Sequence, residues 1–307
     1  MKVIHAANEM EPKDCKVCLA IGFFDGVHLG HQQIIRQTIS DARQHEAQAL
    51  VVTFDCHPST VVAPDRIPPL VYSLPQKLRV IGSLGVDALL LIHFDRPFSE
   101  QSGEGFIRGL ARDLRHIQSL CVGNAFTFGH KRGGNVALLK TLGEELHFTV
   151  HGLAAVSLDN KVVSSTRIRE TIRAGNLDAA SQMLGRAYSL SGQVVRGDQL
   201  GRQLGFPTAN LDVTGLALPP HGVYAAHAQI AGHAYRAVVN IGSRPTLKNP
   251  APEVRLEAHL LDFTGDLYGQ ELELLFIRKL RDEQKFPSLS GLKEQIARDI
   301  AGAQSMF

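Results

Sequence analysis

The stretch VCLAIGFFDGVHLGHQQIIRQTISDARQH, residues 17–45, contains the pattern that decides the fold of the first half of the chain. Residues 17–23 form a nearly continuous apolar run, which is typical of a strand buried on both faces of a parallel sheet. Residues 29–45 place apolar side chains at helical spacing and predict an amphipathic helix. Open α/β sheets bind ligands where such a strand meets the next helix, so the glycine-rich turn between them is a candidate site.

The alternation of strands and helices continues up to residue 184. Apolar runs predict strands at residues 49–54, 88–94, 120–123 and 148–156. Helical spacing predicts helices at 76–84, 105–114, 136–145, 166–172 and 177–184. This alternation predicts a Rossmann-like α/β domain with a parallel sheet over residues 1–184.

After residue 184 the pattern changes to short β-like runs separated by glycines. Strands are predicted at residues 224–230, 235–241, 254–263 and 271–277, and one helix at 290–300. This arrangement predicts a small antiparallel β-barrel, closed by a C-terminal helix, over residues 185–307.

Composition and charge limit the class of protein. The 307 residues include 32 Lys and Arg against 30 Asp and Glu, so electrostatic capture of nucleic acid is not expected. The apolar runs fall short of the roughly 20 residues of a membrane span, and the N-terminal segment lacks the apolar core of a signal peptide. We therefore expect a cytoplasmic protein.

Cys15 and Cys18 have C-x-x-C spacing, which is typical of a zinc or redox site. Near a strand, however, residues three apart point to opposite faces, and no second C-x-x-C pair completes a zinc site.

Two histidines distinguish the glycine-rich turn at residues 22–31. His28 and His31 are three residues apart at the start of the predicted helix, so their imidazoles face the same way. Beside the free amides of a helix N-terminus they form a good site for phosphate oxygens. Zinc binding is disfavoured because no third ligand is close in sequence.

A second anion site is predicted at SSTRIR, residues 164–169. Ser164 or Ser165 can cap the following helix, whose amides would then face an anion. Arg167 and Arg169 are two residues apart, so only one of them is expected to face that anion.

The run GQVVRGDQLGRQLGFPTANL, residues 192–211, predicts a glycine-rich flap over phosphates. Pro207 biases the residue before it toward an extended conformation. Thr208 and Asn210 then share one face, and their oxygens are hard ligands suited to Mg²⁺. Glu257 lies on an alternating strand, where it is either a general base for a substrate hydroxyl or a surface glutamate.

These motifs resemble a known family. GFFDGVHLGH resembles the G-x-F-D-G-x-H-x-G-H motif of prokaryotic bifunctional riboflavin kinase/FMN adenylyltransferases, whose H-x-G-H core is shared by the wider nucleotidylyltransferase superfamily. The resemblance continues through TFDCHP (53–58), VG (122–123), FTFG (126–129) and SSTRIR (164–169). GRQLGFPTAN (201–210) is similar to the riboflavin kinase motif, and VNIGSRPT (239–246), LEAHLLDF (256–263) and LRDEQKF (280–286) support it. Together these stretches cover nearly the whole chain.

For the first domain the resemblance implies a nucleotidylyltransferase fold and FMN adenylylation. His28 and His31 would stabilise charge on the phosphate oxygens while FMN attacks the α-phosphorus of ATP. The residues implied to bind ATP are Gly22, Phe24, Asp25, Gly26, Gly30, Ser164, Thr166 and Arg169, and those implied to bind flavin are Asn124, Phe126 and Phe128. The chain departs from the family at Ala125, where an acidic or amide residue is common; Asn124 would substitute through a one-residue shift.

For the second domain the resemblance implies a riboflavin kinase. Glu257 would be the base for the ribityl 5′-hydroxyl of riboflavin, and Thr208 with Asn210 would hold Mg·ATP. The other residues implied to bind ATP are Gly197, Arg202, Gly205 and Pro207. Arg281 and Phe286 would belong to a second flap near the flavin.

The sequence therefore predicts an enzyme that makes FMN from riboflavin and FAD from FMN. Its expected small-molecule partners are riboflavin, FMN, FAD and ATP, with Mg²⁺ as cofactor and no tightly bound metal. One alternative is a riboflavin kinase whose adenylyltransferase domain is weakened or inactive. Another is a non-catalytic flavin-binding regulator.

Overall fold

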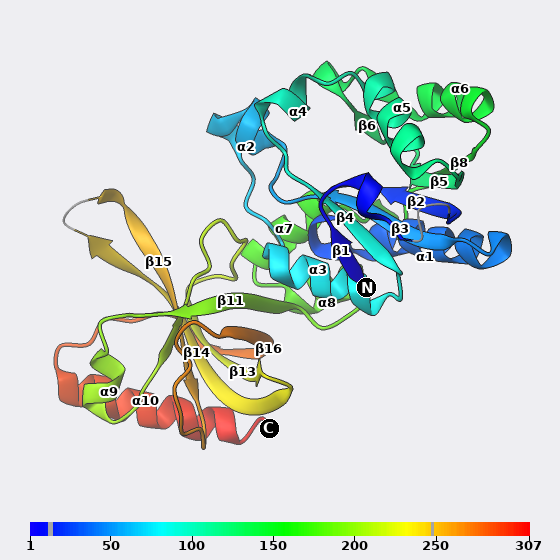
Figure 1. Ribbon diagram of the computed structural model, residues 1–307. Helices are drawn as coiled ribbons and strands as arrows, with labels where there is room; N and C mark the ends of the chain where they lie inside the picture. The colour runs from blue at the N-terminus through cyan, green and yellow to red at the C-terminus, as the bar shows by residue number, and fades with distance from the viewer. Residues whose placement is uncertain (12–14, 247–248) are drawn as a thin grey trace. The chain divides into compact units, whose positions relative to one another are not determined.

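Two compact units make up the chain in the computed structural model, which describes residues 1–11, 15–246 and 249–307 (Figure 1). The first unit is Met1–Arg167 and the second is Ile168–Phe307. The boundary proposed from the sequence, between residues 184 and 185, lies further along the chain, because helix α8 (Leu177–Leu184) clusters with the second unit. Ser181 of α8 accepts a hydrogen bond from the Tyr188 amide at 2.9 Å, which ties the helix to the segment that follows.

The first unit is built on a six-stranded sheet in the order β1-β4-β3-β2-β5-β8, with parallel pairing throughout. Its strands are β1 (Lys2–Ile4), β2 (Val17–Ile21), β3 (Gln48–Phe54), β4 (Ala88–Ile92), β5 (Ile117–Gly123) and β8 (Thr149–Leu153). Its helices are α1 (Leu29–His45), α2 (Ser59–Val62), α3 (Leu74–Ser83), α4 (Arg96–Glu100), α5 (Gly103–Leu114) and α6 (Val136–Leu146). Two small ribbons pair β6 (Thr127–Phe128) with β7 (Gly134–Asn135) and β9 (Ser157–Leu158) with β10 (Lys161–Val162). The predicted Rossmann-like α/β fold is confirmed.

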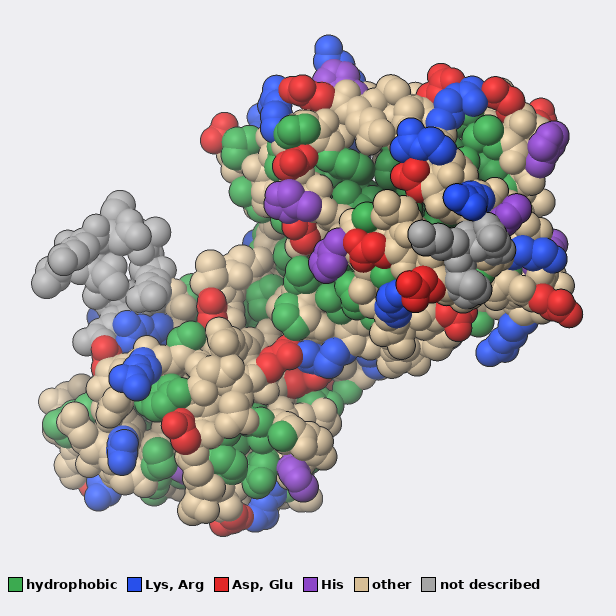
Figure 2. Space-filling view, viewed as in Figure 1, with side chains coloured by type: hydrophobic (Ala, Val, Ile, Leu, Met, Phe, Trp, Pro, Cys, Tyr) green, Lys and Arg blue, Asp and Glu red, His purple; other side chains and the backbone are tan. Residues whose placement is uncertain are grey.

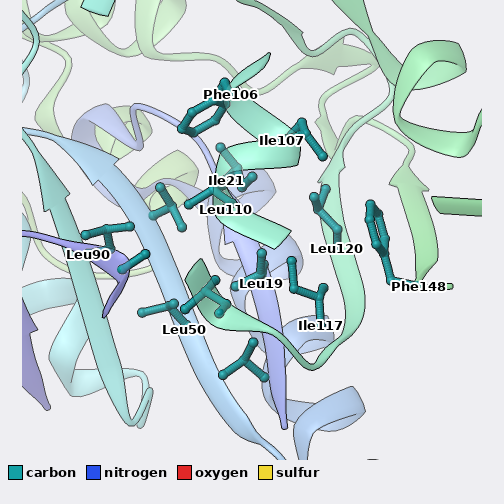
Figure 3. Close-up of a cluster of buried hydrophobic side chains, with 14 of the residues drawn as sticks. Leu19, Ile21, Leu50, Leu90, Phe106, Ile107, Leu110, Ile117, Leu120 and Phe148 are labelled. Atoms are coloured by element: carbon teal, nitrogen blue, oxygen red, sulfur yellow. The ribbon is translucent and has the colours of Figure 1, made fainter. Parts of the chain in front are cut away.

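Strand β2 is buried on both faces, as its apolar run predicts. Leu19 and Ile21 pack with Phe106 of α5 in the cluster shown in Figure 3. Cys18 packs on the opposite face with side chains that include Ile35 of α1. Burial of each large side chain stabilises the unit by about 2 kcal/mol, so the strand that carries the candidate turn is firmly fixed.

The C-x-x-C pair follows the same division between the two faces of the sheet. Cys15 packs against the cluster that contains Phe106, whereas Cys18 belongs to the cluster that contains Ile35. The two thiols therefore lie on opposite faces, as their spacing predicts.

The predicted strand at residues 17–23 ends two residues early, at Ile21. Phe24 adopts a left-handed conformation with φ 54°, and a short 3₁₀ turn, η2 (Asp25–Val27), follows before α1. Strand β1 was not predicted because it is a three-residue edge strand with a single buried side chain, Ile4. So short a segment carries no detectable periodicity.

The second unit is a closed barrel of six strands in the order β11-β12-β15-β14-β13-β16. The strands are β11 (Ser189–Val195), β12 (Ala209–Leu211), β13 (Gly222–Ile230), β14 (His233–Thr246), β15 (Asn249–Leu260) and β16 (Glu271–Arg281). Two helices accompany α8, namely α9 (Leu200–Leu204) and α10 (Leu289–Gln304), and α7 (Ser165–Arg173) precedes them. Ala303 of α10 packs with Val223 and Val238 of the barrel, so the predicted barrel with its closing C-terminal helix is confirmed.

The charges on the surface are mixed, as the nearly equal numbers of basic and acidic residues predict. Figure 2 shows basic and acidic side chains interspersed on the face in view. Within the described residues, no helix is both long enough and apolar enough to cross a lipid bilayer.

Candidate active sites

The turn between β2 and α1 brings the two histidines together. His28 lies just outside α1 as its N-cap, and its Nδ1 accepts a hydrogen bond from the His31 amide at 3.4 Å. The imidazole rings stack with centroids 3.6 Å apart. They therefore face the same way at the helix N-terminus, as the spacing predicts, in a place suited to a phosphate.

Asp25 holds this turn in place through hydrogen bonds. Its side chain is buried, and Oδ1 accepts hydrogen bonds from the amides of Val71 at 2.9 Å and Tyr72 at 3.4 Å. Its backbone carbonyl accepts a hydrogen bond from the Ser165 hydroxyl at 2.9 Å. Gly26 has φ 74°, a conformation that side chains disfavour. These hydrogen bonds show that the carboxylate anchors the loop.

The start of α7 resolves the choice between the two serines. Ser164 Oγ accepts a hydrogen bond from the Arg167 amide at 3.2 Å, so Ser164 is the cap, whereas Ser165 contacts the glycine loop. Arg167 donates to the carbonyls of Leu158 and Lys161 at 3.1 and 2.8 Å, which holds the β9–β10 ribbon. Arg167 is therefore structural. Arg169 lies in the part of α7 that clusters with the second unit, and its predicted contact with ATP stays a prediction.

A cavity of about 500 Å³ opens beside this turn. The sequence-predicted residues that line it are Gly22, Phe24, Asp25, His28, Gly30, His31, Asn124 and Phe126. Ala125 and Ser165 also line it, whereas Gly26, Ser164, Thr166 and Arg169 do not. The structure thus brings both histidines and four of the eight predicted ATP residues to one cavity, and the departure at Ala125 falls on its wall.

A second cavity, of about 740 Å³, adjoins the first and is rich in aromatic side chains. These are Phe23, Phe54, His57, Phe94, Phe98, Phe106, Phe126, Phe128 and His130. Phe126 and Phe128 stack at 5.2 Å, and Phe23 meets His57 edge to face at 4.9 Å. Planar apolar walls of this kind suit a fused-ring ligand. Of the three predicted flavin residues, Phe126 and Phe128 line this cavity and Asn124 lines only its neighbour.

Lys77 is a buried residue that sequence reasoning missed. From α3 its ammonium donates to the Phe54 carbonyl at 2.8 Å and the Phe23 carbonyl at 3.3 Å, and it lies 4.5 Å from the Phe23 ring centroid. Burial lowers the pKa of Lys77 to about 8, although the carboxylates of Asp25 and Asp55 oppose the shift. One buried cation thus supports two aromatic walls of the second cavity. Helical spacing marks such a lysine as inward-facing but does not identify its partners.

The second unit has its own cavity, of about 560 Å³, on the barrel. Thr208, Glu257, Arg281 and Phe286 line it together with residues of α9 and α10. Glu257 is half-buried on β15, and its neighbours Leu256 and Ala258 are buried in the barrel interior, as the alternation predicts. Glu257 and Thr208 therefore line the same cavity.

Strand register places Glu257 between two asparagines. It pairs directly with Asn210 on β12 and with Asn240 on β14. Directly opposite residues of antiparallel strands point to the same face. Asn240 lines the cavity and was missed, because pairing between distant strands cannot be read from local alternation. Asn210 lines an adjoining hollow of about 390 Å³, which it shares with Gly197.

The predicted flap is a short helix packed against the P-T-A-N segment. A Cβ on Gly201 would lie 2.5 Å from the Phe206 carbonyl oxygen and 3.1 Å from Thr208 Oγ1, so α9 approaches closely only because residue 201 is glycine. Gly205 ends the helix with φ 92°. The structure does not bring Arg202, Gly205 or Pro207 to the cavity lining.

Comparison with known proteins agrees with this pair of sites. A family model described as FAD synthetase matches residues 10–167, and one described as riboflavin kinase matches residues 184–307. The chain is 36% identical to the bifunctional riboflavin kinase/FMN adenylyltransferase of Escherichia coli strain K12, over 100% of this chain and 98% of that protein. The chain belongs to the bifunctional riboflavin kinase/FMN adenylyltransferase family. It is an enzyme of FMN and FAD biosynthesis.

Two further relatives extend the comparison. The riboflavin kinase/FMN adenylyltransferase of Haemophilus influenzae is 37% identical over 94% of each chain. A crystal structure described as a macrolide-efflux protein from Streptococcus pneumoniae is 28% identical, with a TM-score of 0.81 over 99% of each chain. The description belongs to that protein, and the likeness shows that the two-domain fold is shared over its full length.

Arg281 of the riboflavin kinase domain has a structural contact at the cavity. Its guanidinium makes a two-pronged ion pair with Asp299 of α10, with Nε–Oδ1 at 2.9 Å and Nη2–Oδ2 at 2.8 Å. Gln295 donates to the same carboxylate at 2.8 Å. Arg281 also lies over the Phe286 ring at 5.7 Å, so this cluster joins β16, α10 and the segment predicted as the second flap.

Proposed function

We propose that the second domain phosphorylates riboflavin with ATP to give FMN and ADP, and that the first domain joins FMN to ATP to give FAD and pyrophosphate. The observation that carries this proposal is the pair of adjoining cavities in the first unit, one aromatic and one at the histidine-bearing turn. A flavin in one and a nucleotide in the other would meet at the shared wall. The barrel cavity, with a carboxylate beside a hydroxyl, supplies the separate kinase site.

In the kinase reaction Glu257 accepts the proton of the ribityl 5′-hydroxyl. That oxygen attacks the γ-phosphorus of ATP, the bond to the β–γ bridging oxygen breaks, and ADP leaves. The half-buried position of Glu257 keeps the carboxylate in the cavity and away from bulk water on one side. Thr208 and Asn240 orient the substrate hydroxyl and the phosphates around it.

The oxygens at this site fit Mg²⁺. Asn210 and Glu257 lie opposite each other on paired strands, and Thr208 directly precedes β12. Their hydroxyl, amide and carboxylate oxygens are the hard donors that Mg²⁺ prefers. Thr208 and Asn210 would hold the ion with the phosphates of ATP. When bound, it neutralises charge on the transferring phosphoryl group.

In the adenylylation reaction an oxygen of the FMN phosphate attacks the α-phosphorus of ATP, and pyrophosphate leaves. The stacked imidazoles of His28 and His31 donate to the phosphate oxygens on which charge develops. The capped start of α7 adds amide donors beside the loop. Positioning and charge neutralisation suffice, so no covalent intermediate with the protein is required.

The test is an incubation of the purified protein with riboflavin, ATP and MgCl₂, with flavins separated chromatographically over time. We expect FMN to appear first and FAD to follow. Glu257→Gln should abolish FMN formation but still convert supplied FMN to FAD. His28→Ala should do the reverse, and each variant is the folding control for the other. Loss of both activities in either variant would contradict the two-site assignment.

A kinase with a weakened adenylyltransferase site is the second candidate, and Ala125 on the nucleotide cavity is the observation that favours it. FMN that accumulates without FAD, even when FMN is supplied, would establish this candidate. Ala125→Asp should then restore FAD formation if the missing side chain is the cause. No product of either kind would favour a flavin-binding regulator.

A further inference from the structure

The two cavities of the first unit share part of their wall. Ile21, Phe23, Phe126, Thr127 and Arg132 line both of them. Arg132 is the one charged residue in this shared set as the structure describes it. An anion that reaches from the aromatic cavity into the nucleotide cavity can therefore meet this side chain at the shared wall.

The short loop that carries Arg132 is firmly placed. Gly129 packs so closely on α5 that a Cβ there would lie within 2.5 Å of the Gly103 Cα. The His130 amide donates to the Gln101 carbonyl at 2.8 Å, and the Arg132 amide donates to the Gly129 carbonyl at 3.0 Å. Lys131 and Arg132 are both left-handed, with φ 52° and 59°, a costly arrangement that is retained here at a cavity wall.

The Arg132 side chain is available to a ligand. Within the residues that the structure describes, its guanidinium makes no hydrogen bond or ion pair. Arg96, another arginine on the aromatic cavity, is instead paired with Glu100 at 2.8 Å. Lys131 lines the aromatic cavity but not the nucleotide cavity. Arg132 therefore differs from Arg96 in its freedom to bind and from Lys131 in its position on the shared wall.

We propose that Arg132 binds the phosphate of FMN at the junction of the two cavities and brings it next to the α-phosphate of ATP. This inference rests on the proposed adenylylation. Two anionic groups must approach each other in that reaction, and a cation between them offsets their repulsion. A guanidinium also fits a phosphate with two parallel hydrogen bonds, which fixes the direction of the attacking oxygen.

Steady-state kinetics of FAD formation from supplied FMN test this role. Arg132→Gln should raise the KM for FMN roughly 10- to 100-fold, the loss expected for one charge-assisted hydrogen-bonded contact, and should leave the KM for ATP within about twofold. Arg132→Lys should recover part of the loss. Lys131→Gln is the matched comparison, because it removes the adjacent charge from the same strained loop but away from the shared wall, and it should raise the KM for FMN much less than Arg132→Gln does.

The outcomes separate this role from others. Equal increases in both KM values for Arg132→Gln would mean that the side chain only maintains the loop or contacts ATP, and would overturn the proposal. If Arg132→Gln and Lys131→Gln raised the KM for FMN equally, the loop would act only by general electrostatic attraction, and the specific role of Arg132 would be refuted. Absence of FAD from the unsubstituted protein would overturn the proposed adenylylation itself, together with this inference. The kinase rate of each variant should remain unchanged.

Discussion

We expect the buried ammonium of Lys77 to give FAD formation by the first unit a pH dependence of its own. Lys77 is 4% exposed and donates to the carbonyls behind Phe23 and Phe54, two walls of the aromatic cavity. Burial lowers its pKa from 10.5 to about 8. About nine-tenths of the molecules carry the charge at pH 7 and about one-tenth at pH 9. If the charged form holds these walls, FAD formation from FMN should fall roughly tenfold between these pH values.

Lys77→Met isolates this effect from other titrations. The assay measures FAD formation from supplied FMN for both proteins at each pH and takes their ratio, which removes effects common to both. The ratio of wild type to variant should fall roughly tenfold from pH 7 to 9, because the variant has no charge to lose. Formation of FMN from riboflavin on the same polypeptide should show no such change in ratio. A constant ratio for FAD formation would refute the reasoning.

The stability of the first unit should change in the opposite direction. The pKa of Lys77 is lower in the folded protein than in the unfolded chain, so the unfolded chain binds more protons between pH 8 and 10.5. Stability should therefore rise with pH across this window, by up to about 3 kcal/mol relative to Lys77→Met. Burial also raises the pKa of Cys56, and the charge of Lys77 opposes that rise. Denaturant titrations of wild type and variant at several pH values measure this difference, and parallel curves would contradict it.

Three further variants test other parts of the structure. Asp299→Ala removes the carboxylate that pairs with the Arg281 guanidinium, so it should lower the free energy of unfolding of the second unit by about 3 kcal/mol in denaturant titrations. An effect no larger than that of removing an exposed acidic residue would show that α10 is held by apolar packing alone. Gly201→Ala would bring a Cβ within 2.5 Å of the Phe206 carbonyl, so the kinase rate should drop while FAD formation from FMN persists; an unchanged kinase rate would mean that the flap tolerates displacement. Ser164→Ala removes the cap of α7 and should cost about 1 kcal/mol and slow FAD formation, whereas a fully active variant would show that the cap is dispensable.

Local patterns in the sequence predicted the elements and the reactive groups well. Helix α1 spans the predicted residues because its apolar spacing and its start at the histidine turn agree. The common orientation of His28 and His31 and the outward face of Glu257 follow from helical and strand geometry alone. Each of these inferences needs only neighbours in the chain.

Features that depend on distant contacts were not predicted. Asn240 joins Glu257 only through the register of β14 and β15. The aromatic cavity collects phenylalanines from segments more than a hundred residues apart, and neither apolar spacing nor the motifs reveal their convergence. Lys77 was missed because helical spacing shows that a lysine faces inward but does not reveal the distant carbonyls that it contacts.

Closure of the barrel has a consequence for the order in which the enzyme is made. The first and last strands pair with each other, Ser189 opposite Leu275, so the barrel remains an open sheet until β16 has been synthesised. The parallel sheet of the first unit is already complete at Leu153. During synthesis on a ribosome the first unit can therefore fold while the barrel strands of the kinase domain still have unpaired edges. Those edges are the part of the nascent chain that most needs protection from aggregation.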